Sequence, residues 1–209
     1  MTGTRDKLLA AAAACLREDG VAAASARTIA ARAGVNQALI FYHFGAVDEV
    51  LAAASRQAVE VSIAGYADRF AAVTSLHELL ALGRELHERE RAAGNVAMMA
   101  QLMSAAPRRP VLAAAAAEAM SAWTEQVEGV LRRVLRGSPV TEVTDVGGLA
   151  RATSAGFIGL ELYDGVAPER AAAALEALDG LGTLLQVLDD LGPVTRRAVR
   201  ARVRRSRRA

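Results

Sequence analysis

The feature that most constrains the fold is a series of three glycines that divides the first 45 residues into short segments. Gly20, Gly34 and Gly45 each follow a segment whose apolar residues recur at helical spacing. Glycine is common just after helix ends because it adopts left-handed backbone conformations at little cost. The pattern predicts helices over residues 5–19, 25–33 and 37–43. Three short helices with a tight glycine turn between the last two are the layout of a helix-turn-helix.

The remainder of the chain predicts long helices only. Hydrophobic residues make up 53% of the sequence and aromatic residues only 4%, and much of the apolar share is alanine, the best helix former. We expect body helices over residues 47–72, 75–104, 111–136, 142–163 and 168–191. The predicted fold class is all-α, with a three-helix head over residues 1–46 and a larger helical body over residues 47–192. Residues 193–209 are expected to be an Arg-rich, disordered tail.

The segment from Ser25 to Phe44 has the residues that a major-groove reader needs. Its buried side is predicted to hold Ile29 and Ile40, which leaves an outward face on a very short helix. A small residue permits close approach to DNA, an amide can pair with adenine through two hydrogen bonds, and aromatic residues can contact the backbone. The outward residues with these properties are Gln37, Ala38, Tyr42 and His43.

The same segment resembles the TetR family pattern T-x-x-x-I-A-x-x-A-G-V-S-x-x-x-L-Y-x-H-F, and the resemblance covers about residues 5–55. It implies a DNA-binding transcriptional regulator, usually a repressor, that a small-molecule effector releases from a near-palindromic operator in double-stranded DNA. By this resemblance three residues fall where family members touch base edges: Arg27, Gln37 and Ala38. Four others fall near phosphates: Thr28, Asn36, Tyr42 and His43.

The head departs from the family pattern in ways that lower its expected affinity for DNA phosphates. Phe41 stands where members usually have Tyr, and Val47 stands where a Lys usually begins the fourth helix. Residues 1–50 hold five Lys and Arg against five Asp and Glu, so the side-chain charge is zero. Because phosphate neutralisation supplies most non-specific affinity, we expect weak binding for a head of this class. The tail has eight arginines and no acid. It is either a solvated terminus or a segment that contacts DNA and compensates for the missing positive charge of the head.

Effector-binding residues are expected in the body, although each has an alternative role in an ordinary core. Methionines adapt to irregular apolar ligands, and pockets are mostly apolar. The candidates are Met98, Met99, Leu102, Met103, Trp123 and Phe157, which favour an apolar or aromatic effector. Possible polar anchors, or alternatively dimer-contact or surface groups, are His77, Glu161 and Tyr163.

A homodimer is predicted from two C-terminal segments. Small residues on one side of a helix allow a second helix to approach closely, and here they are Ala152, Ala155, Gly156 and Gly159. The following segment has a leucine face at helical spacing, formed by Leu175, Leu178, Leu181, Leu185 and Leu188. The resemblance implies that these two segments form a four-helix bundle between two copies, although the leucine face alone is also compatible with an intramolecular core.

An enzyme is not expected, because the sequence has no nucleophile elbow, no phosphate-binding glycine loop and no paired cysteines with zinc spacing. We therefore predict no metal and no cofactor. The pair His87 and Glu90 lies in a run of alternating charges that is typical of a solvated helix face. The single cysteine, Cys15, and the lack of an 18-residue apolar stretch favour a cytoplasmic bacterial protein without a membrane span, bound to the nucleoid when on DNA. The alternative function is a helical ligand-binding protein with a degenerate DNA-binding head.

Overall fold

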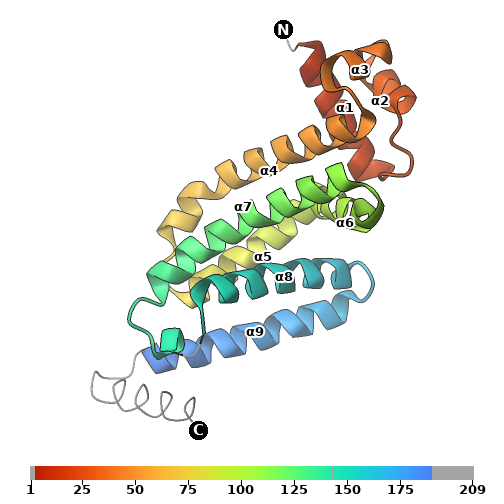
Figure 1. Cartoon of the computed structure of the whole chain (residues 1–209). Coiled ribbons are helices and arrows are strands. Elements are labelled where there is room, and N and C mark those ends of the chain that lie inside the picture. The colour runs from red at the N-terminus through yellow and green to blue at the C-terminus, as the bar shows by residue number, and fades with distance from the viewer. Residues whose placement is uncertain (1–2, 143, 190–209) are drawn as a thin grey trace. The chain divides into compact units, whose positions relative to one another are not determined.

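The computed structural model describes residues 3–142 and 144–189, and all regular structure in that part of the chain is helical (Figure 1). The first four helices are α1 (Thr4–Glu18), α2 (Ala26–Ala33), α3 (Ala38–Phe44) and α4 (Val47–Ala72). They are followed by α5 (Leu76–Ala92), α6 (Asn95–Ala105), the 3-10 turn η1 (Ala106–Arg108), α7 (Pro110–Val134), η2 (Pro139–Glu142), α8 (Val146–Asp164) and α9 (Pro168–Asp189). The predicted all-α class with an N-terminal helix-turn-helix and a helical body is confirmed. The Arg-rich tail lies outside the described residues.

The segment expected to form one helix over residues 75–104 is two helices, so that prediction is wrong. Gly94 has φ +74° and separates α5 from α6. The amide of Gly94 donates to the Arg91 carbonyl at the end of α5, and the Gly94 carbonyl accepts from the Met98 amide at the start of α6. A residue in the left-handed conformation ends an α-helix, and a single glycine inside an apolar run gives too weak a signal to predict this break.

The described chain forms two compact units. The first contains residues 3–65 and 89–122, and the second contains residues 66–88 and 123–189 except residue 143. Neither unit begins or ends at residue 46, where the sequence predicts the boundary between the head and the body. This domain boundary stays a prediction.

The first unit contains α1, α2, α3 and α6 together with parts of α4, α5 and α7. α1 packs against both α2 and α6. Its core includes the fully buried residues Leu8, Leu16, Ile29, Ile40 and Leu51. Ion pairs join α4 to the region of α7: Arg56 Nε lies 2.5 Å from Glu118 Oε2, and Asp48 Oδ1 lies 3.0 Å from Arg109 Nη2.

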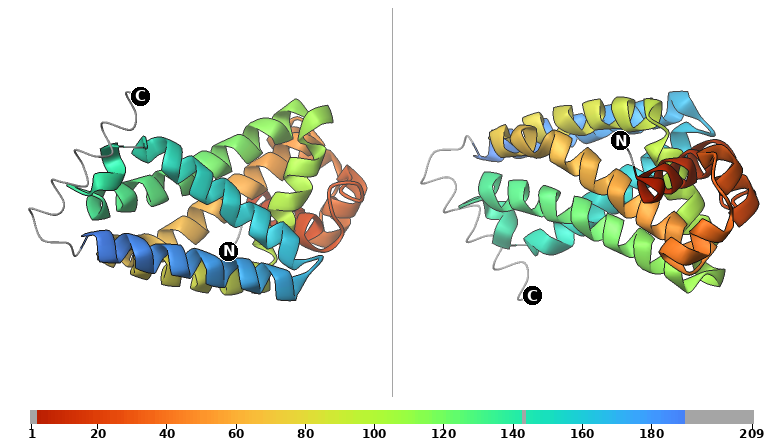
Figure 2. Two further views of the ribbon diagram at one scale, coloured as in Figure 1. Left: turned by 90° about the horizontal axis from the view of Figure 1, so that it is seen from below. Right: turned by 90° about the horizontal axis from the view of Figure 1, so that it is seen from above.

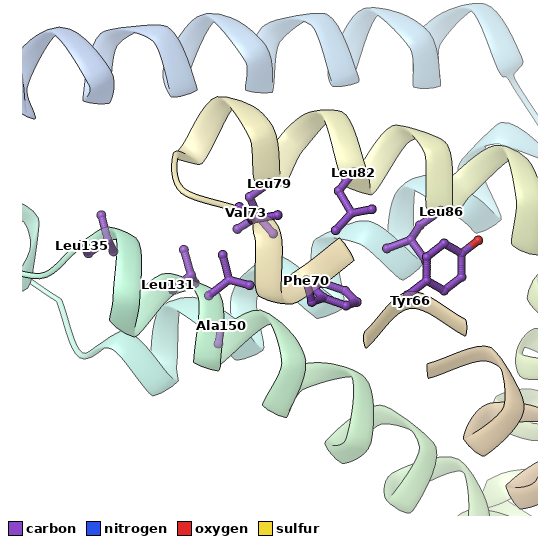
Figure 3. Packing of buried hydrophobic residues seen from close by; sticks show 10 residues of the cluster. Tyr66, Phe70, Val73, Leu79, Leu82, Leu86, Leu131, Leu135 and Ala150 are labelled. Atoms are coloured by element: carbon purple, nitrogen blue, oxygen red, sulfur yellow. The ribbon is translucent and has the colours of Figure 1, made fainter. Parts of the chain in front are cut away.

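The core of the second unit is a cluster of aliphatic and aromatic side chains. Figure 3 shows leucines of α5 beside Tyr66 and Phe70 of α4, with further leucines contributed by α7. α8 packs against α9, and Figure 2 shows these two helices meeting at the turn that joins them and diverging away from it. α8 begins at Asp145, whose carboxylate accepts a hydrogen bond from the Gly148 amide at 2.6 Å.

Candidate functional site

The turn between α2 and α3 is fixed by a glycine in the left-handed conformation. Gly34 has φ +66° and ψ +36°. Its amide donates to the Ala31 carbonyl at 3.2 Å, and the Val35 amide donates to the Ala30 carbonyl at 3.0 Å. This pair of hydrogen bonds is the Schellman arrangement, which satisfies the last carbonyls of a helix. The turn predicted at Gly34 is therefore confirmed, and it sets the direction in which α3 leaves α2.

Two residues that the family resemblance places near phosphates have structural partners within the head. The hydroxyl of Thr28 accepts from the Ser25 amide at 2.9 Å, while the Ser25 hydroxyl accepts from the Thr28 amide at 3.2 Å, which forms a reciprocal cap of α2. Asn36 Oδ1 accepts from the Ala38 amide at 2.8 Å and caps the start of α3. Sequence reasoning missed these capping roles of Thr28 and Asn36.

The residues predicted to face DNA lie on the exposed surface of α2 and α3. Arg27, Gln37, Ala38 and Tyr42 are all exposed, and 80% of the Tyr42 surface is accessible. His43 is half-buried and meets the Tyr42 ring edge to face, with 4.9 Å between ring centroids. On the opposite side, the fully buried Ile29 and Ile40 hold the two helices together. The sequence therefore folds into two short helices whose exposed residues include polar and aromatic side chains.

Acidic neighbours reduce the positive charge that this face offers. The guanidinium of Arg32 contacts Glu18 at 2.6 Å and Asp19 at 3.1 Å. The hydrogen bond that Arg32 donates to the Glu18 carboxylate raises the pKa of Arg32 above its ordinary value, so this arginine stays charged while its charge is balanced locally. At the start of α4, the first turn carries Asp48 and Glu49. Arg27 is the one exposed Lys or Arg in α2 and α3 without an ion pair to another described residue.

Another aromatic residue of α3 is exposed beside the predicted reading face. Phe41 has 52% of its surface accessible, although it carries no polar group. At the end of the helix, the ring of Phe44 lies under the guanidinium of Arg5, with 5.3 Å between the Arg5 Cζ atom and the ring centroid. In this cation–π contact the charge of Arg5 stabilises the packing of α1 against α3. Sequence reasoning missed the contact because the two residues are 39 positions apart.

A chain of hydrogen bonds joins α1 to α4 through the junction of α5 and α6. Arg17 Nε donates to Asn95 Oδ1 at 3.2 Å, and Asn95 Nδ2 donates to Glu90 Oε2 at 2.7 Å. The other oxygen of Glu90 accepts from the Ser62 hydroxyl at 2.5 Å. Gly94 permits this approach, because a Cβ atom there would lie 3.2 Å from the Arg17 side chain. Sequence reasoning did not predict this network, which links the first helix of the head to three body helices, α4, α5 and α6.

The candidate effector residues lie in both units. Met98, Met99 and Leu102 of α6 are buried in the first unit, whereas Met103 is 40% exposed. Trp123 and Phe157 pack against the apolar cluster of the second unit. The structure therefore places the predicted set in separate units.

The aromatic cluster of the second unit contains more rings than the sequence predicted. Trp123 lies 6.2 Å from Tyr66 and 6.3 Å from Phe70, measured between ring centroids. The ring of Phe157 meets His87 edge to face at 6.4 Å. Three further rings, those of Tyr66, Phe70 and His87, thus join the predicted pair. Of the possible anchors, His77 and Tyr163 are exposed, and the side chain of Glu161 lies outside the described residues.

The small residues predicted for a dimer interface are open to solvent in the single chain. Ala152, Ala155, Gly156 and Gly159 of α8 are all exposed, and a Cβ atom added to either glycine would meet nothing within 4 Å. Larger apolar residues follow on the same segment, with Leu162 43% and Val166 83% exposed. The side chains of the remaining candidates lie outside the described residues: Leu175, Leu178, Leu181, Leu185 and Leu188.

Other candidate features of the described residues are metal-ligating side chains, the thiol of Cys15 and apolar helices. No group of three or more His, Cys, Asp or Glu side chains in that part of the chain is arranged to hold a metal ion. Burial raises the pKa of the Cys15 thiol, which favours the less nucleophilic neutral form. No single described helix has the length and apolarity of a membrane span, although α3 and α4, bent by 65°, reach them as a pair.

Comparison with known proteins places this geometry in a family. Residues 8–54 match the family model of the bacterial regulatory proteins of the tetR family. A transcriptional regulator from Rhodococcus sp. Rha1 superposes with a TM-score of 0.71 at 25% identity, over 91% of this chain and all of that chain. The multidrug binding protein EbrR, solved with imidazole, superposes with a TM-score of 0.61 at 29% identity, over 85% of this chain and 96% of that one.

The fold alone is shared with a Rhodococcus sp. protein described as a TetR-family transcriptional regulator, at 20% identity and a TM-score of 0.69 over 87% of this chain and 99% of that one. Among curated proteins, none matches this sequence. The exposed face of α2 and α3 on an all-helical fold defines a helix-turn-helix protein of the transcriptional-regulator class. The match to residues 8–54 assigns the helix-turn-helix segment to the tetR family, and the chain shares the fold of TetR-family transcriptional regulators.

Proposed function

We propose that the protein is a ligand-responsive repressor that acts in the cytoplasm as a homodimer and reads a near-palindromic operator through α3. The observation that carries the proposal is the exposure of Arg27, Gln37, Ala38 and Tyr42 on the helix-turn-helix, whose Ile29 and Ile40 are fully buried. Exposed arginine and amide groups on a short helix can reach base edges in the major groove. Two such heads would contact half-sites about one helical turn of DNA apart.

Each reading residue has a distinct role in this proposal. The Gln37 amide can donate to and accept from adenine, and Arg27 can bind guanine or a phosphate. Ala38 is small and exposed, which permits the close approach of the helix to the base pairs. The hydroxyl of Tyr42 and the ring nitrogens of His43 contact the DNA backbone, which sets the position of α3 without specifying sequence.

The effector is an apolar or aromatic small molecule that binds in the second unit, at the aromatic cluster. Support comes from the rings of Trp123 and Phe157, which are half-buried beside the cluster rather than fully enclosed. An effector can alter DNA affinity only if it binds two conformations of the protein with different affinity. The hydrogen-bonded network of Arg17, Asn95 and Glu90 is the contact through which movement of α5 and α6 would reach α1.

The homodimer forms through α8, with α9 beside it. Support comes from the exposed stripe of small residues on α8, where a second helix can approach closely, and from the exposed apolar residues that follow it. Symmetric dimers are the commonest oligomers, and a two-fold interface would present two heads to two half-sites.

Substitution of Gln37 by alanine tests the assignment of the reading helix. The expected result is relaxed preference at one base position of each half-site, with discrimination there reduced by about 1–3 kcal/mol. His43→Ala and Tyr42→Phe are expected to weaken binding evenly across sequences. A matched control is Gln57→Ala, because Gln57 is also exposed but lies on α4. Binding to a randomised operator library is the measurement, and unchanged base preference in Gln37→Ala would show that another element reads the sequence.

A further inference from the structure

Phe41 places a large apolar ring on the exposed surface of α3. Its side chain has 52% of its surface accessible. The neighbouring rings of Tyr42, His43 and Phe44 contact each other in sequence, but the Phe41 ring makes no such contact with another described residue. Single exposed apolar residues are common on protein surfaces, so the position of this ring within α3 decides what it can contact.

The helical period places Phe41 near the centre of the exposed side of α3. Successive residues of an α-helix are about 100° apart around the axis, so Phe41 lies about 40° from Gln37 and about 60° from Ala38. Both of these residues are exposed, and Gln37 already has helical backbone angles. Tyr42 lies at one edge of the exposed side, next to the half-buried Leu39. The Phe41 ring therefore lies between the two residues that are proposed to face the base pairs.

A phenylalanine ring has neither a donor nor an acceptor, which restricts what it can recognise in DNA. Every base pair presents hydrogen-bonding groups in the major groove, and the one apolar group on a base edge there is the C5 methyl of thymine. Phosphates are contacted by cationic side chains, by hydroxyl and amide groups and by backbone amides. Among the base edges, the group that complements the Phe41 ring is therefore the thymine methyl.

We propose that Phe41 reads the C5 methyl of a thymine in each half-site of the operator and is a further specificity-determining residue of α3. The inference rests on the proposed function, because it takes α3 as the reading helix. Since the Gln37 amide suits adenine, the two residues together would specify A·T pairs at neighbouring positions. Residues 1–50 carry no net side-chain charge, so phosphate neutralisation supplies little affinity and an apolar contact contributes a larger share.

Replacement of thymine by deoxyuridine tests the proposal, because it removes the methyl and keeps the hydrogen-bonding groups of the base pair. The probes are operator duplexes selected with the full-length protein, each with deoxyuridine at one thymine position of both half-sites. A buried methyl contributes about fourfold to affinity, so its loss from both half-sites at the critical position should weaken binding about fifteenfold. Because the methyl is uncharged, this ratio should stay the same when the salt concentration is raised.

Variants of α3 assign the methyl contact to a residue. In Phe41→Ala the ratio of affinities for the thymine and deoxyuridine duplexes should fall to about one, and Phe41→Leu should restore part of it. Ala38→Gly is the matched control, because Ala38 is an exposed apolar residue of the same helix and has a methyl group of its own. It is expected to keep the ratio of the native protein.

Equal affinity of the native protein for every thymine and deoxyuridine duplex would overturn the proposal. A ratio that Phe41→Ala leaves unchanged would also overturn it, because another residue would then contact the methyl. The proposed function is tested separately by comparing the unmodified operator with a scrambled duplex. If the native protein discriminates between these two but is indifferent to deoxyuridine, only the role of Phe41 is wrong. If it does not discriminate, the proposed function itself fails.

Discussion

Gly34→Ala is the substitution whose effect the geometry predicts most directly. Gly34 has φ +66°, and a Cβ atom placed there would meet nothing within 4 Å. The cost is therefore backbone strain without a steric clash. A left-handed conformation costs an L-residue about 1–2 kcal/mol, and the smaller entropy of unfolded alanine offsets part of this. We expect a net loss of about 1 kcal/mol in the free energy of unfolding, or about 2–4 °C in Tm.

Gly65→Ala is the matched control. Gly65 lies inside α4, is exposed, and would likewise place a Cβ atom in open space, but its φ is not positive. Alanine stabilises such a helical position by about 0.5–1 kcal/mol. Urea unfolding followed by circular dichroism at one protein concentration would compare the two variants with the native chain. Equal shifts of the same sign would refute the argument that the turn at Gly34 requires a left-handed residue.

Three further predictions follow from other contacts. Asn95→Ala removes the acceptor of the Arg17 hydrogen bond and the donor of the Glu90 hydrogen bond, and it should lower the free energy of unfolding by about 1–3 kcal/mol. Ser104 is exposed on the same helix, so Ser104→Ala should change the free energy of unfolding little in the same urea titration. The Thr74 amide and hydroxyl donate to the Glu78 carboxylate, and these hydrogen bonds, with a smaller contribution from the Ser75 backbone, hold the pKa of Glu78 below its ordinary value. The stability that this carboxylate contributes is therefore present at neutral pH and is lost as the pH falls through the lowered pKa. Glu78→Gln should be less stable than the native chain at pH 7, and a difference that persists at pH 2 would contradict this. Gly159→Arg should convert the dimer into monomers, as measured by light scattering. Gly129→Arg, at an equally open site on α7, should leave the protein dimeric. A dimeric Gly159→Arg protein would argue against the α8 interface.

The helix-turn-helix could be predicted from sequence because its determinants are local. Ser25, Gly34 and Gly45 mark helix ends within a few residues, and their backbone conformations follow from side-chain capping and from the absence of a Cβ atom. The exposure of Gln37, Ala38 and Tyr42 follows from the same helical period that buries Ile40.

The contacts that long-range packing creates could not be predicted in the same way. Arg17 and Asn95 are 78 residues apart, and nothing in their local sequence indicates that their side chains meet. The break at Gly94 was missed because Ala92 and Ala93 before it, and Ala97 and Met98 shortly after it, are good helix formers. Similarly, the methionines of α6 and the aromatic pair Trp123 and Phe157 looked like one apolar set, whereas folding distributes them between two units.

The central claim, that α3 reads a specific operator, is tested most directly by selecting genomic DNA fragments with the full-length protein at about 0.1 M salt and footprinting the products. The account predicts one or a few enriched fragments that carry a protected near-palindrome, with half-site centres about one helical turn apart. Enrichment without a shared sequence, or protection that extends evenly along every fragment, would contradict it and would favour a ligand-binding protein with a degenerate head.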